Sequence, residues 1–422
     1  MKLAFFGYAW GRPFRPDVYM TETVDSLAQA GVDVDLYLGS QLSKEYGIYG
    51  LSEAVSPDKL ASFIAAEGYD AAISFNNSML IPEIMGALKG PIATVIVDEP
   101  EHLFDYRGDG PYDIFRRNVE IVAMSSALER RLIAAVEGVR PRLHFMLPAT
   151  HIEPRDPAAA PAYPISWIAS YVGDLNLDLY LKLVVDMPEY RALTIRCLDT
   201  LERGGQLSSI VEEGGADAGL IQSLPWSLPY FQTQMQNILT NRGRVAVVER
   251  LSRHGLALFG NAGWRPLIAY NAAVLTALQA GQAPAVHADL RRVYNASRIS
   301  INLPQVHVAP SAVQYRVIDV MASGALMITQ RSENSDLNRV FGDDCPVPTY
   351  ADLDELEALC VHYLTHEDER LARVAACNRL VARGFSFAER AVELLHIVGI
   401  APTANGVPGQ LRWIDLDVVA AA

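Results

Sequence analysis

The segment from residue 294 to residue 331 constrains the fold more than any other part of the chain. Over residues 299–303, isoleucine and leucine alternate with serine and asparagine, which predicts a short strand with one polar face. A loop follows, then a helical pattern that stops at Gly324, and then the run Leu-Met-Ile-Thr, which predicts a buried parallel strand. Strand, loop, helix and strand in this order form the unit that holds a nucleotide diphosphate in many α/β proteins.

The loop of this unit is predicted to bind an anion. Asn302 would end the first strand, and His307 lies in the loop that follows. Ser311 occupies an N-cap position, so the amides of Ala312 and Val313 would be among the free first amides of the helix. Because such amides carry a partial positive charge, they favour a diphosphate at the loop.

The helix of the unit supplies a tyrosine, a cation and a carboxylate. Tyr315 and Asp319 are four residues apart and share a helix face, with Arg316 beside it. Gly324 is predicted to end the helix in the left-handed conformation. The alternative interpretation is that Arg316 and Asp319 form an ordinary surface pair.

Five segments here resemble the donor half of glycosyltransferases with two Rossmann-like domains, the GT-B fold, and most of all the spore-maturation-protein type of the group-1 superfamily. In order, they are LFGNAGW (258–264), LRRVYNASRISIN (290–302), YRVIDVMASG (315–324), VPTYADLDEL (347–356) and YLTHEDER (363–370). Together they extend over most of residues 250–395.

The resemblance implies roles for three residues. In the superfamily an acidic residue of this helix contacts the ribose, and Asp319 stands there, one methylene shorter than the usual glutamate. Arg316 matches an arginine suited to face a diphosphate leaving group. Ser311 departs from the pattern, because many relatives have a sugar-contacting glutamate at this position. The resemblance also implies that neither a metal nor a permanently bound cofactor is required, and that a nucleotide-diphosphate sugar is the co-substrate.

Length and composition limit the alternatives. The chain has 422 residues, more than a single core of about 250–300 residues usually holds, which predicts two domains. A net charge of −14 argues against nucleic acid as a partner. Four cysteines without C-x-x-C spacing indicate reduced thiols and a cytoplasmic protein. No apolar run approaches the roughly 18 residues of a membrane span. Whether the protein is a homo-oligomer is left open.

The order of the predicted elements divides the chain. Residues 1–150 alternate strands and helices in the doubly wound manner and form the predicted acceptor domain. Residues 151–164, rich in proline and alanine, are a linker. Residues 165–385 are the predicted donor domain, interrupted by a helical insertion at about 178–253. Residues 386–422 begin with a helix capped by its first residue and cross back, with the tail packed on the surface of the first domain.

Polar residues end one strand of the first domain. An apolar run at residues 93–97 stops at Asp98 and Glu99, and His102 lies close behind. Catalytic groups of α/β folds gather at such carboxyl ends. We expect one of the three to act as a base toward the acceptor, or to orient it. The alternative is a polar strand end with a solvated loop.

The run after the first strand also has two interpretations. Gly7, Trp10 and Gly11 would lie on the acceptor side of the cleft, where glycine permits the close approach of a ligand. Because no G-x-G-x-x-G pattern is present, a tight turn is the favoured interpretation.

The donor domain holds three further candidates. Gly173 follows the first strand of this domain, and Gly260 follows a strand at residues 256–259. Trp264 would either cover a flat base or pack in the core, and core packing is favoured. In the first domain, the letters D-x-D at Asp33 and Asp35 lie inside a strand and predict a polar strand face, not a metal site.

These predictions lead to one hypothesis. The chain would be a cytoplasmic, metal-independent GT-B glycosyltransferase of hexosyltransferase type that moves a sugar from a nucleotide-diphosphate donor to an acceptor. The sequence does not say whether the acceptor is a glycan, a protein or a small molecule. Retention at the sugar carbon is favoured by analogy alone. A noncatalytic nucleotide-sugar-binding or assembly protein and a nucleotide-sugar epimerase stay open as alternatives.

Overall fold

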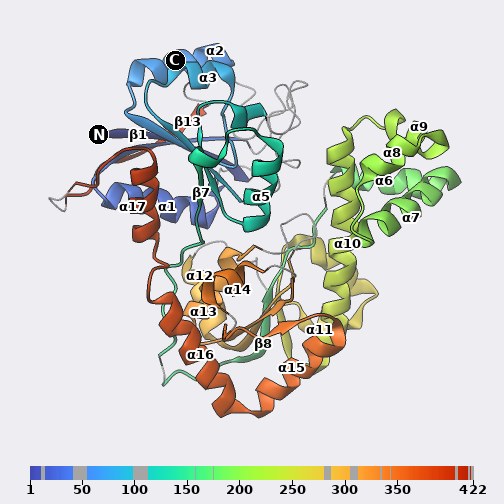
Figure 1. The fold of residues 1–422 in the computed structure, drawn as a ribbon. Helices are drawn as coiled ribbons and strands as arrows, with labels where there is room; N and C mark the ends of the chain where they lie inside the picture. The colour runs from blue at the N-terminus through green and yellow to red at the C-terminus, as the bar shows by residue number, and fades with distance from the viewer. Residues whose placement is uncertain are drawn as a thin grey trace.

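Two parallel sheets form the framework of the molecule. The computed structural model describes residues 1–10, 15–40, 55–97, 113–156, 158–173, 175–279, 287–304, 312–332, 335–342, 344–403, 407–416 and 419. Within these ranges the strands form an eight-stranded and a five-stranded sheet, which Figure 1 shows in two bodies, one above the other. Helices flank both sheets, so the predicted α/β class with two Rossmann-like domains is confirmed.

The first sheet has the order β13-β3-β1-β4-β5-β6-β7, and β2 pairs with β1. Every pairing along this path is parallel, whereas β2 is antiparallel to β1. The strands are β1 (Lys2–Trp10), β2 (Arg15–Pro16), β3 (Asp33–Ser40), β4 (Ala71–Phe75), β5 (Ile92–Ile96), β6 (Glu120–Ala123), β7 (Leu143–Phe145) and β13 (Leu411–Asp415). The chain changes direction across the sheet between β1 and β4, which is where α/β sheets open a ligand crevice.

Local sequence explains most of these elements. Strands β4 and β5 are apolar runs in which every residue is buried, as expected for central parallel strands. Ser56, with Pro57 after it, and Ser125 cap two of the helices through their side chains. The helices of this body are α1 (Val18–Gln29), α2 (Pro57–Glu67), α3 (Pro82–Ala87), η1 (Asp113–Arg116), α5 (Ser126–Ala135) and η2 (Arg140–Arg142).

The second sheet has the order β12-β11-β10-β8-β9, all parallel. Its strands are β8 (Tyr163–Ile168), β9 (Leu256–Phe259), β10 (Ser297–Asn302), β11 (Leu326–Gln330) and β12 (Thr349–Tyr350). The helices that follow β9 are η4 (Ala262–Ala269), α11 (Ala272–Ala277), α12 (His287–Asn295), α13 (Tyr315–Ala322), α14 (Asp336–Phe341), α15 (Leu353–Thr365) and α16 (Glu367–Val381). Here the change of direction lies between β8 and β10.

A helical lobe is inserted between β8 and β9, where the sequence predicted a helical insertion at about 178–253. It consists of α6 (Leu175–Asp186), α7 (Pro188–Glu202), α8 (Leu207–Glu213), α9 (Gly215–Ser223) and the long α10 (Leu228–Leu251), followed by η3 (Ser252–His254). Figure 1 shows it to the side of the second sheet. The lobe has its own core around Tyr180, to which α10 contributes Phe231 and Met235. The last turns of α10 insert Val247 and Val248 into the core of the second sheet, so this helix joins the lobe to the second body.

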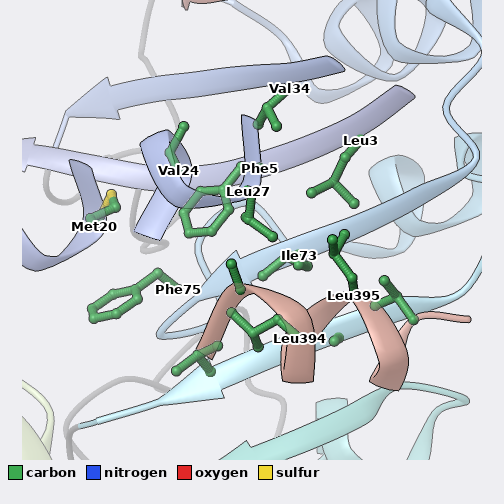
Figure 2. Close-up of a cluster of buried hydrophobic side chains, with 14 of the residues drawn as sticks. Leu3, Phe5, Met20, Val24, Leu27, Val34, Ile73, Phe75, Leu394 and Leu395 are labelled. Atoms are coloured by element: carbon green, nitrogen blue, oxygen red, sulfur yellow. The ribbon is translucent and has the colours of Figure 1, made fainter. Parts of the chain in front are cut away.

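The end of the chain returns to the first sheet. Helix α17 (Phe387–Ile397) packs on α1 and places Leu394 and Leu395 in the cluster that holds Leu3 and Ile73 (Figure 2). The last helix therefore lies against the first sheet and α1. The tail was predicted to pack on the surface of the first domain; in the structure β13 extends the sheet of that body by pairing with β3. No helix of the described residues is both long and apolar enough to cross a membrane.

Candidate functional site

The carboxyl ends of β8 and β10 form the part of the second sheet where a ligand crevice is expected. The loop that leaves β8 is held there by side chains of α10 and of the turn after β9. Asn261 bonds both the amide and the carbonyl of Tyr171, at 2.8 and 3.0 Å. Asn241 accepts from the amide of Val172 at 2.8 Å and donates to its carbonyl. The loop therefore has a fixed conformation, and the predicted Gly173 follows it in an exposed position.

Trp264 packs beneath the loop after β8 and belongs to the core. Its side chain is completely buried, and its Nε1 donates to the carbonyl of Ala169 at 2.8 Å. The interpretation that Trp264 covers a nucleotide base is therefore wrong, because no face of the ring is open to a ligand. Gly260 is required for the same packing, since a Cβ there would lie 2.3 Å from the Trp264 ring.

Arg316 lies where the sequence placed a cation. It projects from the first turn of α13, is half-buried, and donates to the Oδ1 of Asn302 at 3.2 Å. Asn302 ends β10 and is itself fixed, because its Nδ2 donates to Thr329 at 3.0 Å and its carbonyl accepts from Tyr350. Arg316 therefore bonds a neutral amide at the strand ends, and no ion pair joins it to Asp319 among the described residues. The surface-pair alternative is wrong.

Asp319 has a different environment from the one predicted. Its side chain is completely buried, and its two oxygens accept from the hydroxyls of Tyr19 (2.7 Å) and Thr150 (2.5 Å). Burial raises the pKa of Asp319 to about 7, although these hydrogen bonds and Arg316 act in the opposite direction. Tyr19 belongs to the first body and stacks on Tyr315 with ring centroids 4.0 Å apart. In this structure the carboxylate joins the two bodies and has no surface open to a ribose.

The start of α13 corrects another prediction. Ser311 and His307 lie outside the described residues, and the helix begins at Tyr315, not directly after Ser311. Val313 is buried in the cluster beneath α13, and Gln314, the residue before the helix, is extended. The amides of Ala312 and Val313 are therefore not amides of a helix terminus.

Gly324 ends the helix region without adopting the left-handed conformation, so that prediction is also wrong. The Nδ2 of Asn378 donates to the carbonyls of Met321 and Ser323 and thereby satisfies the end of α13. Position 324 requires a glycine, because a Cβ there would lie 2.5 Å from the Cβ of Arg155.

On the first body the structure tests fewer of the predicted residues. Asp98, Glu99, His102 and Gly11 lie outside the described residues, and Trp10 is described only in its backbone. Residues 7–10 belong to β1, so the predicted tight turn is wrong there. Gly7 is buried, and a Cβ would lie 2.2 Å from the sulfur of Met20. Close packing of α1 on the strand, and not a ligand, explains this glycine.

Two features of the crevices were missed by sequence reasoning. The first is a turn at the carboxyl end of β4 in which Asn76, Asn77 and Met79 all have positive φ angles. The side chain of Asn76 accepts from the amide of Val97 at 2.9 Å, which fixes the end of β5 just before the predicted Asp98. An asparagine pair directly after an apolar strand is the signal for such a turn.

The second missed feature is a buried polar face on α10. Its members recur with a period of about seven residues, two helical turns, which places them on one side of the helix and could have been recognised in the sequence. They are Thr233, Gln234, Asn237, Thr240, Asn241 and Arg244, each less than 9% exposed.

Comparisons with known proteins agree with this architecture. Residues 243–396 match the model of a family described as glycosyl transferase-like. No curated protein matches the sequence. Among solved structures, HepE of Anabaena in complex with UDP and glucose aligns with a TM-score of 0.54 at 10% identity, over 94% of this chain and 99% of HepE. Sucrose-phosphate synthase of Thermosynechococcus elongatus aligns with a TM-score of 0.55 at 12% identity, over 94% and 98% of the two chains. The chain has the GT-B fold. The spore-maturation type within that fold stays a prediction.

Proposed function

We propose that this protein is a glycosyltransferase that moves a sugar from a nucleotide-diphosphate donor to an acceptor. The observation that supports this most directly is the placement of Arg316 and Asn302 at the carboxyl ends of the second sheet of a GT-B fold. HepE, which shares the fold at low identity, is described in complexes with UDP and with UDP-glucose. A hexose donor, metal independence and retention at the sugar carbon belong to the proposal by resemblance.

In this proposal the donor diphosphate lies beside Arg316. Departure of the nucleotide leaves negative charge on the phosphate oxygens, and a guanidinium held at the strand ends stabilises that charge. Asn302 limits the positions open to the guanidinium, because it is itself anchored to Thr329. The rigid loop after β8 forms one wall of the site and needs no rearrangement to receive the donor.

The acceptor would approach from the first body. Asp98, Glu99 and His102 remain our candidates for the acceptor base, and Trp10 and Gly11 for its binding. Asp319 remains our candidate for the ribose, with one added condition. The ribose hydroxyls would have to replace the hydroxyls of Tyr19 and Thr150, which requires the two bodies to shift.

The test is calorimetric titration of the protein with a panel of nucleoside diphosphates and their sugars, followed by product analysis. We expect saturable binding of one diphosphate, and a loss of about 10- to 100-fold in Arg316→Ala, the range for a hydrogen bond to a charged group. Arg331→Ala is the matched control, because Arg331 follows a neighbouring strand but pairs with Glu355 at the surface.

Each outcome has a distinct meaning. Conversion of the donor without any acceptor would favour the epimerase alternative. Binding without turnover would favour the noncatalytic alternative. If no nucleotide on the panel binds, the proposal is wrong.

A further inference from the structure

The first body has a cavity of about 690 Å³ at the edge of its sheet opposite the predicted acceptor residues. Ile92 begins β5 and Glu120 begins β6, and both line the cavity, which therefore lies at the amino ends of these strands. The candidate residues for sugar transfer lie at carboxyl ends, so the proposed transfer does not use this cavity. Its volume is within the range of about 300–1,000 Å³ that small-molecule sites have.

Core residues from both faces of the first sheet form an apolar floor in the cavity. Phe5 and Phe6, neighbours on β1, belong to two different core clusters, because successive side chains of a strand point to opposite faces. Ile92 comes from the cluster of Phe6 and Val398 from the cluster of Phe5, and both are buried. Three half-buried side chains complete the apolar lining: Met85 of α3, Leu88 just after it, and Ile397 at the end of α17. An apolar group that covered this floor would remove it from water.

The walls of the cavity are fixed by contacts outside it. Gly90 lines one wall, and a Cβ there would lie 1.8 Å from the carbonyl oxygen of Asp70, so this position requires a glycine. On another wall, Arg142 donates to three backbone carbonyls within residues 115–119, at 2.5–2.8 Å. These bonds hold the turn that places Asn118 at the cavity. A ligand would therefore enter a preformed site.

The free polar side chains of the lining can donate hydrogen bonds. Lys89, Asn118 and His396 are exposed, and in the part of the chain that the structure describes no hydrogen bond or ion pair occupies their side chains. Glu120 is the one carboxylate among the described lining residues, and it already bonds the Nε2 of His144 at 2.8 Å. One unpaired ammonium with neutral donors beside it favours a single anionic group.

We propose that this cavity binds an amphipathic anion, a molecule with an apolar body and one anionic group. The body would cover Ile92 and Val398, and the anionic group, a carboxylate or a phosphate monoester, would bind Lys89 and Asn118. Because the cavity includes the end of α17, the ligand would also stabilise the packing of this helix on the first sheet. The alternative is a water-filled depression whose lining residues only pack.

A titration followed by the methyl NMR signals of isoleucine tests this site. The probes are octanoate, octyl phosphate, octanol and octylammonium, which share one chain and differ in the head group. We expect saturable shifts of the Ile92 and Ile397 signals, whereas Ile195, which is 59% exposed on the helical lobe, should show none. The two anions should bind at least about threefold more tightly than octanol or octylammonium. The tighter anion identifies the head group as a carboxylate or as a phosphate monoester.

Three variants test the recognition of the head group. Lys89→Met removes the ammonium but keeps an apolar stem, so it should weaken the binding of both anions by about two- to fivefold and leave octanol unchanged. Lys59→Met is the matched control, because Lys59 is an exposed lysine of α2 outside the cavity. Glu120→Gln removes the carboxylate of the lining and should strengthen the binding of both anions by about two- to fivefold.

Two kinds of result would overturn the inference. If no probe shifts the Ile92 and Ile397 signals in a saturable way up to about 5 mM, the cavity takes no such ligand. If octylammonium binds as tightly as octanoate, or if Lys89→Met and Lys59→Met lose equally, the anionic group is not recognised. Neither result bears on the nucleotide titration of the second body, so the inference and the proposed function can fail separately.

Discussion

At the scale of single residues, Asp319 combines the features that matter most for how the two bodies interact. It is completely buried, yet both oxygens accept hydroxyl hydrogen bonds, one from Tyr19 of the first body and one from Thr150, which directly precedes the segment between the bodies. Because the pKa of Asp319 is raised to about 7, the folded protein holds this proton more tightly than the unfolded chain does. The stabilisation from Asp319 is therefore full below about pH 4 and is lost as the pH rises through 7.

The direction of this pH dependence leads to a prediction for the stability of Asp319→Asn. The asparagine resembles the protonated aspartic acid, so the free energy of unfolding of the variant should be close to that of the wild-type protein at pH 3.5, where Asp319 is protonated in both the folded and the unfolded state. At pH 8 the variant should be the more stable, by up to about 4 kcal/mol, because it has no buried charge. Urea unfolding at the two pH values measures the difference. A wild-type advantage that grows toward pH 8 would show that the carboxylate is stabilised in its charged form.

At the scale of elements, ion pairs stabilise the edge strand β13 on the first sheet. The carboxylate of Asp35 is only 2% exposed and accepts from Arg412 at 2.7 and 2.5 Å and from Tyr69 at 2.6 Å. Burial alone would raise the pKa of Asp35, but hydrogen bonds from Arg412 and Tyr69 lower it. Arg412 also reaches Glu67 at 2.9 Å. The predicted polar strand face is thus a buried ion cluster at Asp35, whereas Asp33 is exposed.

Removal of the Arg412 guanidinium should destabilise the protein, because the carboxylate of Asp35 would stay buried. We expect Arg412→Leu to lower the free energy of unfolding by about 3–5 kcal/mol at pH 7, since Asp35 would keep a buried charge without its main partner. Lowered carboxylate pKa values stabilise the fold above about pH 4, so the penalty should shrink as the pH falls below that value. Thermal unfolding at pH 7 and pH 3.5 measures both effects. Trp413→Ala is the control on the same strand, because Trp413 is 52% exposed and should change stability far less.

At the scale of the whole molecule, the first core is completed by the end of the chain. Leu395 is completely buried among residues of β1 and α1, although the whole second body lies between them in sequence. The two bodies are therefore linked by the 151–164 segment, by α17 and by contacts such as Ser126 to Asp336 at 3.0 Å and Arg339 to Glu129 at 2.9 Å. If the two bodies move relative to each other, the chain must bend in the 151–164 segment and where it enters α17.

Substitutions in α17 can measure how much its packing contributes to the stability of the first core. Leu395→Ala should destabilise the protein by about 2–5 kcal/mol, because it leaves a cavity in the first core. Val392 lies on the same helix but is 45% exposed, so Val392→Ala should cost less than about 1 kcal/mol. Hydrogen exchange of β1 should accelerate in the first variant only. Equal effects of both substitutions would mean that α17 is not part of the first core in solution.

Local patterns were sufficient for much of the fold. The central strands were predicted because continuous apolar runs bury on both faces, and the helix after Ser386 because serine is a good N-cap. The structure adds that Ser386 and Glu389 form a capping box. The cation at Arg316 and the polar strand end at Asn302 followed from spacing within one strand–loop–helix unit. These features depend on residues close together in sequence, and the resemblance added the order of the two domains.

Other features depend on residues far apart in the chain, and only the tertiary structure decided them. The sequence alone determined the class of the fold, most of its elements and one cation of the candidate site. It did not determine that Asp319 meets Tyr19 across 300 positions, that the partner of the buried Trp264 is the carbonyl of Ala169, that β13 pairs with β3, or that Arg244 reaches the loop after β8. Burial and partner choice are set by which surfaces meet when distant segments pack, and no local pattern contains that information.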